Sequence, residues 1–327
     1  MKRNNTVDIL RCLGTLLVIL AHTSPPAAIA GIRTFDVSLL VMISGYCSNY
    51  KCGNFGPYIV KRIKRLCVPA WKTMTLIFVT CGVLCLVSHR PYLYSLKQIV
   101  ETYLFIGGME GGIGLFWIVR IYLLVALLTP VADRIGKAPF WVTGVSVAGL
   151  LALNEGCYAM LWNKSAALNF ILENVVMSGL AYAAVYIIGI SIRDKHCVVK
   201  YLLASAGIFF LLEAIFKQEY FSKPSAFKYP PQLGYVIYGI FVSTLLWIIV
   251  EQMRTKTPPN WVRWISANSF NMYLAHALIM YCYSWGDKYI SRIPWMKYWL
   301  VRFCVFLSGS AFLVNLCLRR GKGRDIC

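Results

Sequence analysis

The chain has 327 residues, of which 58% are hydrophobic and 14% are charged, and its formal net charge is +20. A soluble fold of this length cannot bury so much apolar surface, so lipid is expected to be its solvent. The positive charge does not indicate nucleic-acid binding, because loop lysines and arginines beside anionic membrane lipids account for it.

The apolar stretch at the N-terminus is predicted to be a membrane helix. A secretory signal peptide would have an uncharged apolar region and a cleavage site of small residues. This stretch carries Asp8 and Arg11 and has no such site.

Ten apolar runs are long enough to cross a bilayer, since a crossing needs about 20 residues. They lie near residues 7–24, 34–50, 66–88, 113–132, 140–154, 173–192, 198–216, 234–250, 264–285 and 299–318. The run at 99–107 is too short to span and is predicted to be interfacial or re-entrant. The pattern predicts an all-α, polytopic integral membrane protein with about ten transmembrane helices. A single membrane-embedded domain is expected over residues 1–327, without a separate soluble domain.

The distribution of basic residues predicts the orientation. With the N-terminus placed inside, 18 lysines and arginines fall in cytoplasmic segments and 10 fall outside. This excess favours both termini in the cytoplasm. The remaining five lie within spans or at their ends, where a charge is costly and suggests a function or a partner; they are Arg11, Lys72, Arg120, Lys200 and Arg302.

A polar stripe runs along the first predicted helix. Arg11 and His22 are eleven residues apart, so on an α-helix their directions differ by roughly 20° and their rise differs by about 16 Å. Asp8 lies one turn before Arg11 and can pair with it, and Thr15 adds a hydroxyl. Taken singly, the acid and arginine can be a structural ion pair and the histidine a packing group. Together on one face, they favour a polar path through the membrane.

The cysteines do not predict a disulfide or a metal site. The twelve cysteines include no CxxC pair, and several lie in apolar runs where a thiol behaves as a small hydrophobic group. No metal and no tightly bound cofactor are therefore expected.

Short motifs occur in order along most of the chain. They are Asp8-Ile9-Leu10-Arg11 followed by His22, Ile43-Ser44-Gly45-Tyr46, Lys61-Arg62-Ile63-Lys64-Arg65 ending at Pro69, Phe116-Trp117, Lys228-Tyr229-Pro230-Pro231, and Tyr273-Leu274-Ala275-His276. This ordered set resembles the acyltransferase-3 family of integral membrane acyltransferases. The resemblance implies a multi-pass protein of the bacterial cytoplasmic membrane. It also implies O-acyl transfer, usually of acetyl from acetyl-CoA as a cosubstrate, to a sugar hydroxyl of a surface polysaccharide or a lipid-linked glycan.

The residues of the first helix and the following basic run are assigned to catalysis and donor binding. His22 is predicted to be the general base, because a sugar hydroxyl is a poor nucleophile until its proton is removed. Asp8 and Arg11 complete the predicted catalytic set. Arg11 is also predicted to bind the CoA phosphates with the four-residue basic cluster, whose members are Lys61, Arg62, Lys64 and Arg65. The cluster also fits simple positive-inside anchoring.

Five further residues are predicted to line the acceptor site. Ser44 can carry a covalent acyl group, although the Ser44-Gly45 pair is better explained by close helix packing. Lys228 and the two prolines after Tyr229 are predicted to shape an acceptor site on the outer face, although Pro230-Pro231 also fits an ordinary rigid loop. Tyr273 and His276 share a helix face and can line a cavity or form a satisfied core pair. Arg120 is predicted to pair with a carboxylate or contact a ligand.

A different class of protein also fits the composition. A transporter or a flippase of lipid-linked glycans would show buried charges, many spans and basic inner loops. The chain has no matched broken helices and no similar halves, features that are common in secondary transporters. A non-catalytic scaffold would leave the stripe on the first helix without a purpose.

Overall fold

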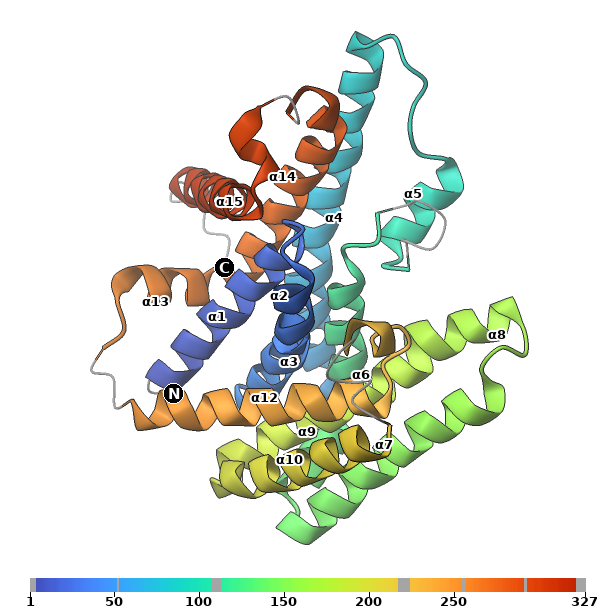
Figure 1. Cartoon of the computed structure of the whole chain (residues 1–327), viewed down its shortest axis with the longest axis vertical. Coiled ribbons are helices and arrows are strands. Elements are labelled where there is room, and N and C mark those ends of the chain that lie inside the picture. Colours follow the sequence, from blue (N-terminus) through green and yellow to red (C-terminus); the bar gives the residue numbers. More distant parts are fainter. Residues whose placement is uncertain are drawn as a thin grey trace. The chain divides into compact units, whose positions relative to one another are not determined.

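Regular structure in the described part of the chain is entirely helical. The computed structural model describes residues 4–51, 53–106, 113–216, 224–253, 257–290 and 293–321, and no strand occurs in these ranges (Figure 1). The α-helices are α1 (Asn5–Ala21), α2 (Ala27–Ile32), α3 (Asp36–Tyr46), α4 (Phe55–Val87), α5 (Leu96–Tyr103), α6 (Trp117–Lys137), α7 (Phe140–Leu161), α8 (Ala166–Ile171), α9 (Ser178–Lys195), α10 (Val198–Ile215), α12 (Leu233–Gln252), α13 (Asn260–Ala267), α14 (Ser269–Ile290) and α15 (Trp299–Gly321). Short 3-10 turns lie at η1 (Arg33–Phe35), η3 (Pro224–Phe227) and η4 (Pro294–Lys297), and a π-helical turn, η2 (Leu172–Met177), joins α8 to α9.

Seven helical segments in the described ranges are long and apolar enough to cross a membrane. They are Ala27–Tyr46, Phe55–Val87, Phe140–Leu161, Ala166–Lys195, Val198–Ile215, Leu233–Gln252 and Trp299–Arg319. The chain is therefore an all-helical membrane protein. The count of about ten crossings and the cytoplasmic position of both termini stay predictions.

Each of the ten apolar runs overlaps a helix, but two boundaries differ in ways that affect the site. Helix α4 begins at Phe55 and not near residue 66, so the basic run lies in a helix and not in a loop. The run at 264–285 is interrupted at Asn268, which separates the short α13 from α14. The short run near residue 100 forms α5, an eight-residue helix that is too short to span.

The chain groups into two compact units. The first consists of Met1–Gly14, Ala27–Arg62 and Ile121–Pro259. Within it, α3 packs along α9, α10 packs along α12, and α7 packs against α9. The prediction of a single domain stays a prediction.

Two glycines allow α3 and α9 to approach closely. A Cβ atom added at Gly45 would lie 2.1 Å from the Tyr186 carbonyl oxygen, and one at Gly189 would lie 2.0 Å from the Met42 carbonyl oxygen. Both distances are below any normal contact, so no larger residue fits without moving a helix. The expected packing role of the Ser44-Gly45 pair is confirmed for Gly45, as small residues at membrane helix interfaces let backbones meet.

The second unit consists of Thr15–Pro26, Ile63–Arg120 and Asn260–Cys327. Its paired helices α14 and α15 enclose a cluster of buried apolar side chains. The buried members are Ile19, Met272, Phe306 and Val314. This packing holds the last turns of α1, through Ile19, against α14 and α15.

Candidate active site

Two histidines from distant parts of the sequence face each other in the second unit. Helix α1 ends at Ala21, and His22 occupies the turn that follows, where its backbone N–H donates to the Ile19 carbonyl at 3.1 Å. His276 lies on α14 and is fully buried. The centroids of the two imidazole rings are 5.3 Å apart, with 36° between the ring planes. We call His22 and His276 the histidine pair.

The hydrogen bonds of His276 are incomplete. Nδ1 and Nε2 make no hydrogen bond of normal geometry within the part of the chain that the structure describes, although the Met272 and Tyr273 backbones on the same helix act on the imidazole. A buried polar atom without a partner is costly, by about 1–3 kcal/mol, and is rare in folded proteins. The arrangement is therefore suited to a ligand or a reacting group that donates to the imidazole or accepts from it.

Tyr273 lies on the same face of α14 as His276 and holds that face in place through its contacts. Its ring centroid lies 5.3 Å from that of His276, and its hydroxyl donates to the backbone carbonyl of Leu115. Phe116 contacts the Tyr273 ring edge to face at 6.4 Å, and Phe270 stacks at 6.2 Å. The expectation that Tyr273 and His276 share a face is confirmed, and apolar rings surround the tyrosine.

Arg120 supports the backbone near α5. Its Nη1 donates to the Phe105 carbonyl at 2.7 Å, and Phe105 has a φ of 61°, which is unusual for a residue other than glycine. The Phe105 ring also stacks on Trp71 with centroids 6.4 Å apart. This contact of Arg120 is structural, and its predicted contact with a substrate stays a prediction.

Arginines gather at one end of the first unit, which we call the arginine end. Arg11 donates from Nη2 to Cys47 Sγ at 3.2 Å, and Asp8 is buried on the same helix. The charges of Arg11 and Arg62 both act on the hydroxyl of Tyr122. Two guanidinium groups from α1 and α4 therefore lie near one phenol on α6.

The structure separates the four members of the basic cluster. Arg62 is partly buried, and its guanidinium lies over the Tyr58 ring at 5.3 Å from the centroid. Lys61, Lys64 and Arg65 are exposed. Only Arg62 therefore turns toward the other groups of the arginine end, and positive-inside anchoring suffices for the exposed three.

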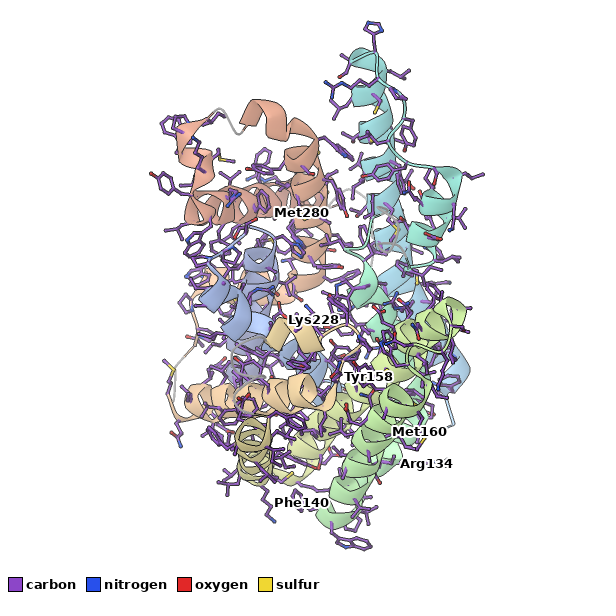
Figure 2. All side chains as sticks on the ribbon, turned by 45° about the vertical axis from the view of Figure 1, so that its right-hand side comes forward. Arg134, Phe140, Tyr158, Met160, Lys228 and Met280 are labelled. Carbon is purple, nitrogen blue, oxygen red and sulfur yellow. The ribbon has the colours of Figure 1, made fainter. Side chains whose placement is uncertain are left out.

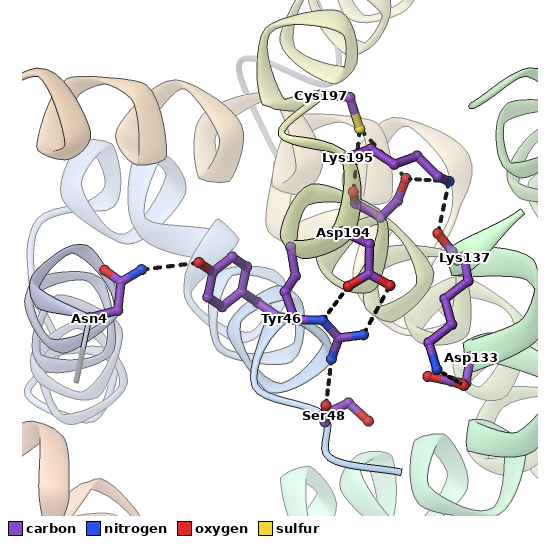
Figure 3. Close-up of polar contacts among 11 residues, drawn as sticks. Asn4, Tyr46, Ser48, Asp133, Lys137, Asp194, Lys195 and Cys197 are labelled. Atoms are coloured by element: carbon purple, nitrogen blue, oxygen red, sulfur yellow. Dashed lines mark hydrogen bonds and ion pairs between the residues drawn. The ribbon is translucent and has the colours of Figure 1, made fainter. Parts of the chain in front are cut away.

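Further charges of the arginine end are engaged within the protein (Figure 3). Arg193 donates to the Ser48 carbonyl and contacts Asp194 through Nε at 2.5 Å and Nη2 at 3.2 Å. Lys137 pairs with Asp133, and Lys195 donates to the Gly136 carbonyl at 2.9 Å. Because Cys47 and Ser48 directly follow α3, Arg11 and Arg193 both hold the segment after this helix.

Lys228, labelled in Figure 2, lies in the loop after η3 and is partly buried. Its ammonium is 5.3 Å from the centroid of the Tyr229 ring. Burial lowers the pKa of Lys228; the charge of Asp36 opposes this shift and that of Arg33 adds to it. Arg33 and Asp36 form an ion pair of 2.6 Å at the start of α3.

Several contributors to these sites were not identified from the sequence. Tyr122 and Leu115 gave no local signal, because each contacts its partner only after distant helices pack. Tyr58 did give a signal, because it precedes Arg62 by four residues on α4 and so shares its helix face. Asp36 did give a signal: it follows Arg33 by three residues at the start of an apolar run, a spacing that places opposite charges together on a helix.

The apolar helices and a family-profile match together define the class of this protein as a membrane-embedded acyltransferase. The profile of the acyltransferase-3 family, described as "Acyltransferase domain", matches residues 4–316. The chain belongs to this family. Neither curated proteins nor solved structures gave a match to the chain.

Proposed function

We propose that this membrane acyltransferase moves an acetyl group from acetyl-CoA to a sugar hydroxyl of a surface polysaccharide or of a lipid-linked glycan precursor. The membership of the family supports acyl transfer. The identities of the acyl donor and the acceptor are inferred from the resemblance to the family and from the chemistry of the arginine end and the histidine pair.

The histidine pair is the observation that carries the proposal. His22 is partly buried beside the fully buried imidazole of His276, whose nitrogens make no hydrogen bond of normal geometry in the described residues. Little water can reach a base in such an enclosed place, so a bound sugar hydroxyl can become its hydrogen-bond partner. His276 then orients the same hydroxyl or the His22 ring.

The proposed reaction is a direct transfer. His22 accepts the proton of the sugar hydroxyl while the hydroxyl oxygen attacks the thioester carbonyl carbon. The carbon–sulfur bond breaks, the acetyl ester forms on the sugar, and the CoA thiolate takes up a proton as it leaves. No covalent acyl-enzyme is needed, and the partly buried Ser44 serves as a lining residue beside Gly45.

Arg11 and Arg62 are proposed to bind the CoA phosphates. Arginine presents a planar pair of donors that matches phosphate oxygens. Helix α1 carries Arg11 and ends one residue before His22, and the ten residues from Arg11 to Ala21 rise by about 15 Å along its axis. The slender pantetheine arm can follow that helix and deliver the thioester to the histidine. Asp8 is proposed to hold the Arg11 side chain in position.

The proposed orientation places both termini and the basic cluster in the cytoplasm of a bacterium and the Lys228 loop outside. A cysteine introduced at Lys64 in a background without native cysteines should react with a membrane-impermeant thiol reagent only after permeabilisation. A cysteine at Lys228 should react in intact cells. Labelling of both positions from the same side would contradict the transfer of acetyl across the membrane.

The function is tested by comparing surface glycans from cells with and without the gene by mass spectrometry. We expect loss of O-acetyl groups without the gene, restoration by the wild-type chain, and no restoration by His22→Ala. His89→Gln is the matched control, because His89 is exposed. Full acetylation by a correctly inserted His22→Ala protein would overturn the role of His22, and unchanged glycans in the deletion strain would overturn the acceptor class.

A further inference from the structure

An open groove lies in the second unit between the short helix α13 and the long helix α15. Its volume is about 540 Å³, and the described side chains that line it all belong to these two helices. Neither His22 nor His276 is among them. The groove is therefore separate from the histidine pair, although both belong to the same unit.

Helix α13 forms one wall of the groove with two tryptophans. Trp261, Trp264 and Ile265 line it, and their spacing of three and four residues places them on one helix face. Trp261 is 58% exposed, whereas Ile265 is buried. A short helix with an apolar face and an exposed tryptophan is typical of the boundary between hydrocarbon and lipid headgroups. We therefore expect α13 to lie at this boundary.

Helix α15 forms the other wall. Cys304, Ser308, Ala311 and Asn315 line it from successive turns of one helix face. From Cys304 to Asn315 the helix rises by about 16 Å, which is close to half of the ~30 Å hydrocarbon layer. Helix α15 is also long and apolar enough to cross a membrane. The groove thus matches the length of a lipid acyl chain in one leaflet.

A basic side chain follows the groove at one end. Arg319 lies four residues after Asn315 on α15, which is about 40° around the helix and about 6 Å further along it. Arg319 is exposed and belongs to the segment that is predicted to be cytoplasmic. An arginine at that level attracts the phosphate of an anionic lipid. The groove and the arginine can therefore hold the chain and the headgroup of one lipid.

The groove adjoins the apolar cluster of the second unit. Trp264 and Ala311 line the groove and also pack against the cluster that contains Ile19 and Met272. Met272 lies one helical turn before His276 on α14. A lipid chain in the groove would contact the same side chains, so it should stabilise the packing on which this part of α14 depends.

We propose that the α13–α15 groove binds one acyl chain of an anionic phospholipid from the cytoplasmic leaflet, with the lipid phosphate at Arg319. The headgroup lies near Asn315, and the end of the chain lies near Cys304. The lipid stabilises the second unit and takes no part in acyl transfer, so this inference does not depend on the proposed function.

The test uses phosphatidylglycerol with a photoreactive diazirine at the end of one acyl chain. The full chain is placed in phosphatidylcholine nanodiscs with a small fraction of this probe, and the cross-linked residues are mapped by mass spectrometry. We expect the turn around Cys304 to be labelled despite the excess of phosphatidylcholine, and to lose its label when unlabelled phosphatidylglycerol is added. The same addition should raise the temperature of unfolding.

Two variants separate the chain from the headgroup. Ser308→Trp fills the groove and should remove most of the label at Cys304. Arg319→Gln leaves the groove open and should weaken displacement by phosphatidylglycerol about fivefold, the effect of one basic residue beside an anionic headgroup. Cys317→Trp is the matched control, because Cys317 is exposed on the same helix about 180° from Ser308; it should keep the label.

The proposal would be overturned by a label at Cys304 that phosphatidylglycerol does not displace, or by wild-type labelling in a correctly assembled Ser308→Trp protein. Wild-type displacement in Arg319→Gln would also overturn it, and this variant decides the matter if Ser308→Trp does not fold. Displacement by a polyprenyl phosphate but not by phosphatidylglycerol would assign the groove to a glycan carrier lipid. A dimer linked through Cys304 under mild oxidation would assign it to a second copy of the chain. Either result would overturn the proposal.

Discussion

The arginine end and the histidine pair differ in how far their buried polar groups are hydrogen-bonded within the protein. At the arginine end, Arg193 contacts Asp194 and a backbone carbonyl, and Arg11 contacts a thiol. In the histidine pair, neither nitrogen of the fully buried His276 makes a hydrogen bond of normal geometry among the described residues. The first arrangement fixes helix ends, whereas the second keeps hydrogen-bonding capacity for a ligand. Buried polar groups thus divide into those that stabilise the fold and those that are available for chemistry.

Replacement of His276 should separate activity from stability most clearly. His276→Phe keeps an aromatic ring of similar width and removes two buried nitrogens, so the free energy of unfolding should not fall. Acetyl transfer should fall by about 100-fold, because a positioned acid or base contributes 10²–10⁴ in rate. Transfer is measured with radiolabelled acetyl-CoA, and stability by thermal unfolding in detergent. A Phe variant with wild-type transfer would show that the histidine pair is only a packing contact.

An added methyl group between α3 and α9 tests whether the close approach of these helices stabilises the fold. Gly45→Ala or Gly189→Ala places a methyl group about 2 Å from a backbone oxygen, which should reduce the free energy of unfolding by about 3 kcal/mol. Gly207→Ala on α10 is the control, because nothing lies within 4 Å of its added Cβ. Denaturant titrations that give the same stability for the three variants would contradict this account of the α3–α9 interface.

Donor binding distinguishes the inward arginines from the exposed lysines. Arg11→Lys and Arg62→Gln should each raise the KM for acetyl-CoA by about tenfold, or about 1.4 kcal/mol, because neither replacement retains the bidentate guanidinium. Lys64→Gln should change KM by less than about twofold, since an exposed charge is well screened. Equal effects of Arg62→Gln and Lys64→Gln would assign donor attraction to the net charge of the cluster.

The smallest effect is expected at Tyr273. Tyr273→Phe keeps the ring contacts with Phe116 and Phe270 and removes the bond to the Leu115 carbonyl. A typical hydrogen bond contributes about 1 kcal/mol, so stability should fall by that amount and transfer by a fewfold. A loss of transfer as large as that of His276→Phe would move Tyr273 from a positioning residue to a catalytic one.

The helices were predicted from the sequence because apolar run length is a strong local signal in membrane proteins. Every predicted run overlaps a helix, including 140–154, which lies in α7. The basic run was placed in a loop because charge was taken to mark the membrane boundary, but α4 continues through it. Helical periodicity also extended the first helix through His22, whereas α1 ends at Ala21.

Only those parts of the site that lie on one helix could be predicted from the sequence. The shared face of Tyr273 and His276 follows from their spacing on one helix, and it is confirmed. The contact between His22 and His276 joins residues 254 positions apart, and nothing in the local pattern specifies it. Arg62 differs from its exposed neighbours in its position near two aromatic rings: Tyr58 lies four residues earlier on α4, whereas Tyr122 lies on α6 and could not be inferred from the local sequence. The roles of these residues in catalysis and donor binding stay predictions.

The length of α4 has a mechanical consequence for the cations that it carries. Its 33 residues correspond to about 50 Å, whereas the hydrocarbon layer is about 30 Å thick. A straight helix of this length that stood perpendicular to the membrane would extend roughly 20 Å beyond the layer, and its residue count would set both the height and the direction of Arg62. One alanine inserted after Leu66 would turn Arg62 by about 100° relative to the rest of α4, whereas seven would nearly restore its direction and displace it by about 10 Å. Insertions of one and of seven residues in α4 would therefore separate the effect of the direction of Arg62 from the effect of its height in the membrane.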